Sequence, residues 1–201
     1  MIRTIILDLG RVLVPFDFSR AYRVVSERAG IPPEEVRARI IAAQLIVPFE
    51  SGQMEPAEFV LRMSQAIGVP MEYDEFSRIW SLIFLPETLI PEEWVRSLHT
   101  RYRTVLLSNT NAIHYSMLRA NYPILAHFHA YVLSHEVKAM KPDPRIYAAA
   151  IEAAQCRPNE CFYTDDVPEF VEAGRAAGLE AVQFQNADQL RSQLALRGIM
   201  L

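Results

Sequence analysis

The chain has 201 residues, and its 51% hydrophobic and 22% charged content is typical of a globular protein rather than a disordered or fibrous one. The formal net charge of −4 does not favour nucleic-acid binding, and no apolar run is long enough to cross a bilayer. The two cysteines fit a reducing compartment and the N-terminus shows no signal-peptide pattern, so we expect a cytoplasmic monomer or homodimer without a nucleic-acid or membrane partner.

The first predicted strand covers residues 4–9 and carries the most informative acid of the chain. Its run of apolar, β-branched residues contains Asp8 near the end, and a glycine turn at Gly10 follows at once. Open α/β folds place their ligands at the carboxyl ends of parallel strands, and an aspartate there can attack phosphorus as a nucleophile. Taken alone, Asp8 is equally compatible with an Asx turn that closes the strand.

Four amphipathic helical patterns follow the first strand, at residues 20–29, 33–43, 56–67 and 73–84. A crossover between parallel strands needs only one helix, so we interpret this block as an inserted helical-bundle cap domain at residues 16–85. A helix at 91–101 then leads back into an α/β core domain formed by residues 1–15 and 86–201. The aromatic stripe of the cap helices, which includes Trp80, is expected to be the core of the bundle.

Four further strand-like runs lie downstream, at residues 104–108, 131–134, 161–164 and 181–184. Helical patterns separate them, and this repeated βα alternation predicts an α/β fold with a parallel sheet covered by helices on both faces. Polar residues that follow these strands would meet at the carboxyl side of the sheet, where a ligand is expected.

Polar residues follow the second strand and occupy a later loop. Ser108 and Asn109 come at the end of the strand, just before a helix expected to begin near Asn111. A hydroxyl and backbone N–H groups at a helix start suit a phosphate, although helix capping by Ser108 or Asn111 would explain the same residues. Lys141 lies in the loop KAMKPDPRIY, where it can reach a phosphoryl oxygen as a point charge or be a solvated loop lysine.

Two adjacent acids, Asp165 and Asp166, follow the strand at 161–164. Neighbouring carboxylates repel each other unless a cation neutralises them, and hard oxygen ligands in a phosphate-handling site favour Mg²⁺. Adjacent acids are also common on surface turns, so the pair indicates a metal site only in combination with the other polar residues. Together, the acids, the serine and the lysine suggest chemistry on a phosphate ester.

The motifs DLGRVLV, LLSNT, KPDPRIY and FYTDD resemble those of the haloacid dehalogenase superfamily of hydrolases. The helical insertion after the first motif resembles the C1-type cap of that family, and the resemblance, which covers the whole chain, implies a three-layer, Rossmann-like core. The stretches LSNTN and FESGQMEPAEF and the paired aspartates are similar to the branch that contains sugar-phosphate phosphatases.

The resemblance implies roles for the residues of these motifs. Asp8 would attack phosphorus, and water would then hydrolyse the aspartyl phosphate. Ser108 and Lys141 would hold the transferring phosphoryl oxygens, helped by the backbone N–H of Asn109. Leu9, next to the nucleophile, is a further candidate position for phosphate binding.

The resemblance also implies a Mg²⁺ site made by Asp8, the backbone carbonyl of Gly10 and Asp166, with Asp165 acting through water or orienting Lys141. The common family pattern has a second aspartate two residues after the nucleophile, which serves as general acid and base, but Gly10 stands there. Glycine still supplies the backbone carbonyl but has no side chain to donate a proton. General acid–base catalysis of this kind raises the rate of reaction by about 10²–10⁴-fold. We therefore expect a working but slower enzyme that favours leaving groups departing without protonation, such as an anomeric sugar phosphate or an acyl phosphate.

Further residues are candidates for contacts around the substrate. Asp17 and Glu50 lie near predicted cap edges and are candidate substitutes for the missing acid, although an N-cap role for Asp17 and a solvated turn for Glu50 are the stronger interpretations. Glu50 also matches the cap stretch of the sugar-phosphatase branch, which makes it a candidate specificity residue. Arg11 can touch the substrate or point to solvent. Phe170 stands where that branch often has an asparagine, which puts one supporting hydrogen bond in doubt.

The sequence therefore predicts a Mg²⁺-dependent phosphatase that hydrolyses a small phosphorylated metabolite, with a sugar phosphate favoured, through an aspartyl-phosphate intermediate. One alternative is a metal-independent 2-haloacid dehalogenase of the same superfamily, which would also lack the second aspartate. The paired acids argue against it, because a metal-free site has no use for two adjacent carboxylates. The other alternative is a non-catalytic phosphate-binding homologue.

Overall fold

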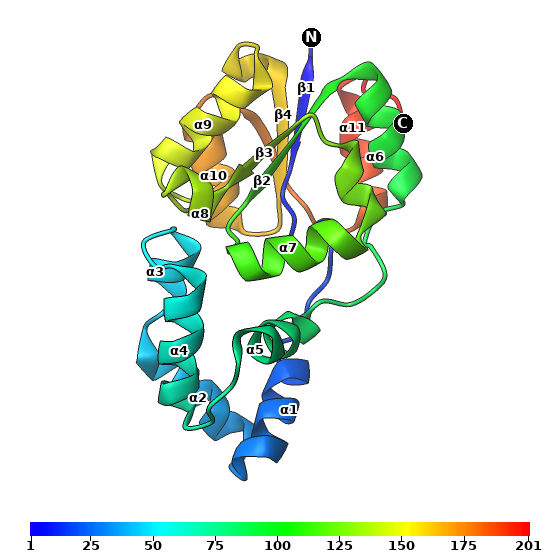
Figure 1. Cartoon of the computed structure of the whole chain (residues 1–201). Helices are drawn as coiled ribbons and strands as arrows, with labels where there is room; N and C mark the ends of the chain where they lie inside the picture. The colour runs from blue at the N-terminus through cyan, green and yellow to red at the C-terminus, as the bar shows by residue number, and fades with distance from the viewer.

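A five-stranded parallel sheet organises the larger part of the molecule (Figure 1). The computed structural model describes residues 1–201. The strands lie in the order β3-β2-β1-β4-β5, so β1 is central and pairs with both β2 and β4. Their bounds are Thr4–Leu7 for β1, Arg103–Ser108 for β2, Ala130–Leu133 for β3, Cys161–Asp165 for β4 and Glu180–Gln183 for β5. The predicted α/β class with a parallel sheet is confirmed.

The central strand β1 ends two residues earlier than its apolar pattern predicts. The N–H of Asp8 still donates to the carbonyl of Thr164 at 3.1 Å, but the chain then turns. The N–H groups of Leu13 and Val14 both donate to the carbonyl of Leu9 at 2.9 Å, which closes a tight loop. This loop places the Asp8 side chain at the carboxyl edge of the sheet. The other strands differ from the predicted ranges by single residues at their ends.

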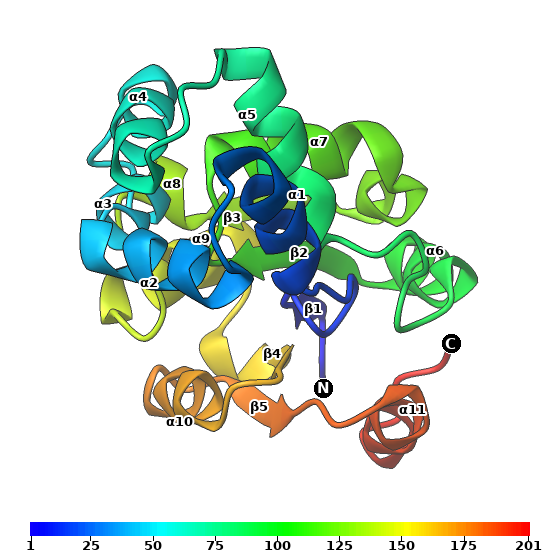
Figure 2. The same ribbon diagram turned by 90° about the horizontal axis from the view of Figure 1, so that it is seen from below.

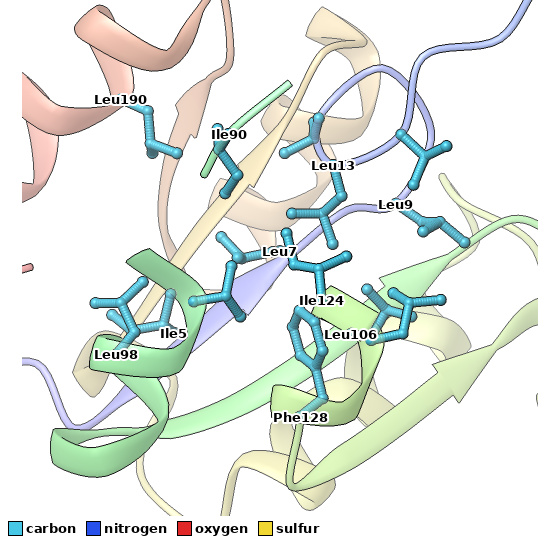
Figure 3. Packing of buried hydrophobic residues seen from close by; sticks show 14 of the residues in the cluster. Ile5, Leu7, Leu9, Leu13, Ile90, Leu98, Leu106, Ile124, Phe128 and Leu190 are labelled. Carbon is cyan, nitrogen blue, oxygen red and sulfur yellow. The ribbon is translucent and has the colours of Figure 1, made fainter. Parts of the chain in front are cut away.

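Helices cover both faces of the sheet. Successive residues of β1 point to opposite faces, so each face carries apolar side chains that a helical layer must bury. Ile5 and Leu7 belong to a cluster of 21 buried residues on one face, and Figure 3 shows them packed near Leu98, Ile124 and Phe128. That face is covered by α6, α7 and α11, at Glu92–Arg101, Ala112–Asn121 and Ala187–Leu196. The opposite face is covered by α9 and α10, at Pro144–Ala154 and Pro168–Ala176. Short elements complete the core: α8 at Ser134–Val137, and 3₁₀ turns at Pro123–His127 and Pro158–Glu160.

A second group of helices lies beyond the carboxyl ends of the strands (Figures 1 and 2). They are α1 at Ser19–Ala29, α2 at Pro33–Ala43, α3 at Ile46–Glu50, α4 at Pro56–Ile67 and α5 at Tyr73–Trp80. They enclose a hydrophobic cluster of their own, in which Phe59 stacks on Phe49 with ring centroids 4.0 Å apart and meets Phe76 edge-on at 5.8 Å. The assignment of residues 16–85 to a separate cap domain stays a prediction.

Two details of this helical group were not predicted. α3 spans five residues with Pro48 inside it, which is too short to produce a helical period in the sequence. The predicted helix at 73–84 ends at Trp80 and continues as a 3₁₀ turn at Ser81–Ile83. No helix of the structure has the length and apolar character that crossing a membrane would require.

The outgoing and returning connections run side by side in antiparallel directions. The N–H of Asp17 donates to the carbonyl of Ile83 at 2.7 Å, and the N–H of Leu85 donates to the carbonyl of Pro15 at 3.0 Å. A further contact joins α3 to the core, where the Ser134 hydroxyl donates to the carbonyl of Glu50 at 2.6 Å. The helical group is thus held over the sheet edge both at its connections and through α3.

Candidate active site

The carboxyl edge of the sheet brings two carboxylates together around one buried amine. β1 and β4 are adjacent, so Asp8, just after β1, lies beside Asp165 at the end of β4. The Lys141 Nζ donates to Asp8 Oδ1 at 2.6 Å and to Asp165 Oδ2 at 2.5 Å. All three side chains are buried. Lys141 is therefore a member of the site and not a solvated loop lysine, whereas Lys138 is exposed.

Asn109 holds the loop that carries Lys141. Its side-chain Nδ2 donates to the carbonyl of Lys141 at 3.0 Å, and its Oδ1 accepts the N–H of Lys141 at 2.7 Å. The family resemblance implies only a backbone contact of Asn109 with phosphate, and the sequence shows no sign of this clamp, because the two residues are 32 positions apart in the chain. The ring of Phe170 lies 5.1 Å from the Lys141 Nζ and faces the ammonium, which is a favourable cation–π arrangement.

The second acid of the site is held by two donors. The Tyr163 hydroxyl donates to Asp165 Oδ2 at 2.5 Å, and the N–H of Val167 donates to Asp165 Oδ1 at 3.0 Å. These bonds fix the carboxylate that faces Lys141, which supports the expectation that Asp165 orients this lysine. Asp166, the next residue, is half-buried.

Burial and charge act in opposite directions on the ionisable groups. Burial raises the pKa of Asp8 to about 7, although the Lys141 ammonium lowers it. Burial lowers the pKa of Lys141, but Asp8 and Asp165 outweigh it and hold that pKa above its usual value. Burial, and then the charge of Asp165, raises the pKa of Asp166. The site therefore concentrates negative charge that one ammonium only partly compensates.

Three carboxylates of the site suit a hard divalent cation. Asp8, Asp165 and Asp166 each offer one oxygen, and these atoms all lie within 4.8 Å of one another. Mg²⁺ prefers oxygen ligands and is commonly bound by one or two carboxylates together with water. The donor set and the excess negative charge fit such an ion.

Ser108 is buried at the end of β2 with its hydroxyl only weakly engaged. Its one hydrogen bond in the protein is a long contact of 3.4 Å to the carbonyl of Asn109. The cap of α7 is instead Asn111, whose side chain accepts the N–H of His114 at 3.0 Å. The helix-capping alternative therefore holds for Asn111 and not for Ser108, and the serine hydroxyl remains free to bind a ligand.

The turn after the nucleophile contains Leu9, Gly10 and Arg11. Leu9 is buried in the core, and both Leu9 and Gly10 line a cavity next to the site. A Cβ built on Gly10 would lie 2.9 Å from Cε1 of Phe16, so this ring fills the space where an acidic side chain would begin. Arg11 is exposed, has a φ of 57°, and its guanidinium lies 4.9 Å from the centroid of the Phe16 ring.

The two candidate substitutes for the missing acid lie in different surroundings. Asp17 is exposed and accepts the N–H of Ser19 at 2.9 Å and the hydroxyl of Ser19 at 2.8 Å. The N-cap of α1 is Phe18, so the expected N-cap role of Asp17 is corrected to an Asx turn one residue earlier. Glu50 lines the cavity and is partly buried, so the expectation of a solvated turn acid is corrected. Burial raises the pKa of Glu50 to about 7, against the effect of the Asn111 amide.

A cavity of about 730 Å³ opens between the helical group and the sheet edge. Its walls include Ser108 and Asn109 from the core together with aromatic residues from the connections and from α1 and α5. Trp80, expected to be bundle core, packs on Phe76 with ring centroids 5.4 Å apart and also lines this cavity. No periodicity in the sequence reveals the cavity, because its lining comes from segments that are distant in the chain.

Known proteins resemble this chain over most of its length. A family model described as haloacid dehalogenase-like hydrolase matches residues 2–178. The D-ribitol-5-phosphate phosphatase of Bacteroides thetaiotaomicron is 24% identical over 203 aligned residues, which cover 98% of each chain. A phosphatase of Mycobacterium tuberculosis is 26% identical over 204 aligned residues, which cover 94% of this chain and 90% of the relative.

Solved structures share the fold. A haloacid dehalogenase-family enzyme from Bacteroides thetaiotaomicron, crystallised with magnesium and inorganic phosphate, superposes with a TM-score of 0.82 at 24% identity. The superposition covers 92% of this chain and 96% of that chain. A predicted hydrolase of the same family from Porphyromonas gingivalis gives a TM-score of 0.82 at 24% identity and covers 100% of both chains.

Proposed function

Because the chain belongs to the haloacid dehalogenase-like hydrolases, we propose that it is a Mg²⁺-dependent phosphatase that hydrolyses a small phosphorylated metabolite. The observation that carries this proposal is the position of Asp8 at the sheet edge, bonded to Lys141 and grouped with two further carboxylates beside an open cavity. The arrangement supplies a nucleophile, positive charge for phosphoryl oxygens and a place for the organic part of an ester.

The reaction begins at Asp8. Its ionised carboxylate attacks phosphorus, forming an O–P bond while the ester O–P bond breaks and its electron pair leaves with the alcohol oxygen. The Lys141 ammonium and the Ser108 hydroxyl hold the phosphoryl oxygens, and the backbone N–H of Asn109 adds a donor. Water then attacks the aspartyl phosphate, which releases inorganic phosphate and restores Asp8. Leu9 holds the start of the turn in the core, so that the nucleophile has a fixed orientation.

Asp8, Asp166 and the backbone carbonyl of Gly10 would hold Mg²⁺, with Asp165 acting through water or through its bond to Lys141. When bound, the ion neutralises the carboxylates and the phosphoryl oxygens, so that an anionic nucleophile can approach an anionic ester. The carboxylates are supplied by the ends of two adjacent strands and need no rearrangement of the sheet.

Protonation of the leaving oxygen determines which esters the protein can hydrolyse. Gly10 carries no proton donor, and Phe16 fills the space beside it. The alcohol must therefore depart as a stable anion or take a proton from another group, for which Glu50 in the cavity wall is the candidate. Arg11 lies at the edge of the same turn, where it can contact an anionic substrate. The preference for a sugar phosphate stays a prediction.

The test uses acetyl phosphate, whose leaving group needs neither a proton nor the cavity. We expect Mg²⁺-dependent hydrolysis by the parent protein and a loss of roughly 10³-fold or more in the isosteric Asp8→Asn variant. Equal rates in parent and variant would refute the mechanism. Chloride release from 2-chloropropionate without Mg²⁺ would instead establish the dehalogenase. Binding of inorganic phosphate without turnover of acetyl phosphate would establish the non-catalytic homologue.

We also infer that the helices of residues 16–85 act as a cap over the site. Water must be excluded while phosphorus is transferred, and a lid above a sheet edge can do this. The paired connections at Pro15 and Leu85 are the places where such a lid would bend. The expected cytoplasmic location, the monomeric or homodimeric state, and the absence of nucleic-acid and membrane partners likewise remain predictions.

A further inference from the structure

We propose that the substrate is a phosphate monoester of an apolar alcohol, aromatic or branched aliphatic, whose organic group occupies the cavity between the helical group and the sheet edge. The inference rests on the proposed phosphatase function and adds the chemical class of the leaving group. It is an alternative to the predicted preference for a sugar phosphate, because a sugar requires a polar cavity lining and a hydrocarbon of the same size requires an apolar one.

The cavity is continuous with the reacting centre. Gly10, Ser108 and Asn109 form part of its lining. Gly10 follows Asp8 by two residues, Ser108 ends the strand that pairs with β1, and Asn109 is bonded to the lysine loop, so the cavity borders the reacting centre. An ester whose phosphorus lies against Asp8 therefore has its organic group in this space. With a volume of about 730 Å³, the cavity is in the range of sites that enclose small molecules.

One side of the cavity is a continuous aromatic wall. Phe16 meets Phe18 edge-on with ring centroids 5.3 Å apart, and it meets Phe84 in the same way at 6.3 Å. The His114 ring lies 4.9 Å from Phe84 and stacks with Trp80 at 5.8 Å. All five rings line the cavity, and such a surface attracts apolar and aromatic groups rather than hydroxyls.

Another part of the lining is aliphatic and exposed. Ile41 of α2 and Val47 of α3 line the cavity, yet they are 59% and 63% exposed. Apolar side chains gain by leaving water, so an apolar ligand that covers them would bind more tightly than a polar one. Of the 18 lining residues, 11 are hydrophobic, which makes this composition a property of the whole cavity.

Few polar groups of the lining are available to a polyol. Asn109 uses both ends of its amide on the backbone of the lysine loop. His114 uses its Nε2 on a carbonyl of α5 and its Nδ1 on a neighbouring amide, both at 3.1 Å. The remaining polar side chains of the lining are Gln44, Glu50, Ser108, Thr110 and the hydroxyl of Tyr22, and the hydrophobic residues outnumber them. A sugar would turn several of its hydroxyls toward this hydrophobic majority, and each buried unpaired hydroxyl weakens binding.

The surroundings of Gly10 agree with this reading of the cavity. The position where the family's proton donor would begin is filled by the apolar ring of Phe16, whose Cε1 lies 2.9 Å from a Cβ built on Gly10. The wall beside Gly10 is therefore hydrocarbon, in agreement with the hydrophobic majority of the lining.

The decisive experiment compares cyclohexylmethyl phosphate with glucose 6-phosphate at saturating Mg²⁺. Both are primary phosphate esters attached through one CH₂ to a six-membered ring, so the difference is the ring's polarity. We expect kcat/KM to be about tenfold or more higher for cyclohexylmethyl phosphate. A ratio of one or less overturns the inference, and so does hydrolysis of neither ester by protein that turns over acetyl phosphate.

A binding measurement keeps the inference testable if acetyl phosphate is not turned over. Titration of the Asp8→Asn variant with each ester in the presence of Mg²⁺ should give a Kd for cyclohexylmethyl phosphate about tenfold or more below that for glucose 6-phosphate. Equal affinities, or tighter binding of the sugar, would overturn the inference whatever the catalytic state of the protein. Failure of the phosphatase proposal and failure of the leaving-group proposal thus give different results.

Matched variants locate the preference in the cavity. Ile41→Asn should lower the ratio of the two kcat/KM values by about threefold or more, because it places an amide in the aliphatic wall. Leu61→Asn is the control, since Leu61 is also 59% exposed on a helix of the same group but lies outside the cavity lining. An unchanged ratio in Ile41→Asn, or an equal fall in Leu61→Asn, would contradict the assignment of this cavity.

Discussion

The Phe16 ring occupies the space into which a side chain at Gly10 would extend, with its Cε1 2.9 Å from the position of a Cβ. The two residues are linked by the tight turn after β1 and by the start of the connection to the helical group. The absence of an acid at position 10 is therefore part of a packed arrangement and not an isolated change.

We expect Gly10→Ala to lower the free energy of unfolding by about 1–2 kcal/mol, because the added methyl group overpacks against Phe16. Phe16→Leu should cost stability by itself, and in the double variant much of the Gly10→Ala cost should disappear. Chemical denaturation of the four proteins measures this coupling as a double-mutant cycle. Additive effects would show that the ring moves aside freely.

Removing the buried ammonium should strongly lower the free energy of unfolding. Lys141→Met leaves Asp8 and Asp165 facing each other without their shared partner, and breaking a buried ion pair costs about 3–5 kcal/mol. Urea denaturation at neutral pH without divalent cations checks the value, and phosphatase activity should fall with it. Lys138→Met is the matched control, because Lys138 is exposed three residues earlier in the same loop. A similar loss of stability in both variants would point to a loop effect instead.

Glu50 is expected to donate a proton to leaving groups that need one. Burial raises its pKa to about 7, so the carboxyl is protonated below that pH and loses its proton as the pH rises through it. At saturating Mg²⁺, kcat/KM for an alkyl phosphate relative to acetyl phosphate should fall above about pH 7 in the parent protein. Glu50→Gln should lower this ratio and remove its pH dependence. Identical profiles in the two proteins would exclude Glu50 as the donor.

His114 should make folding sensitive to acid. Burial lowers its pKa to about 4, while the unfolded chain has a value near 6.5, so the unfolded state binds more protons between these two values. The stability that depends on neutral His114 is present above about pH 6.5 and is lost as the pH falls toward 4, by up to about 1.4 kcal/mol per pH unit. Denaturation curves across this range should show a shallower slope for His114→Gln. An unchanged slope would place the acid sensitivity in other groups.

Local patterns in the sequence determined most of the fold. The apolar runs of β1 and β4 read as buried strands because both faces of a central parallel strand are covered, and the prolines at the starts of α2 and α4 mark helix starts. The order of the polar motifs also placed Asp8 and the acid pair at one edge of the sheet. These features depend on periodicity and on the rule that parallel strands end together, so they can be read along the chain.

Only the tertiary structure decided how these residues meet. The bond from Lys141 to both Asp8 and Asp165 and the clamp of Asn109 on the lysine loop join segments separated by 24 to 133 residues. The filling of the space at Gly10 by Phe16 and the apolar lining of the cavity depend on how the connections and the helical group settle over the sheet. Side-chain packing of this kind has no period in the sequence, because the free energy of each contact depends on partners that the fold alone brings together.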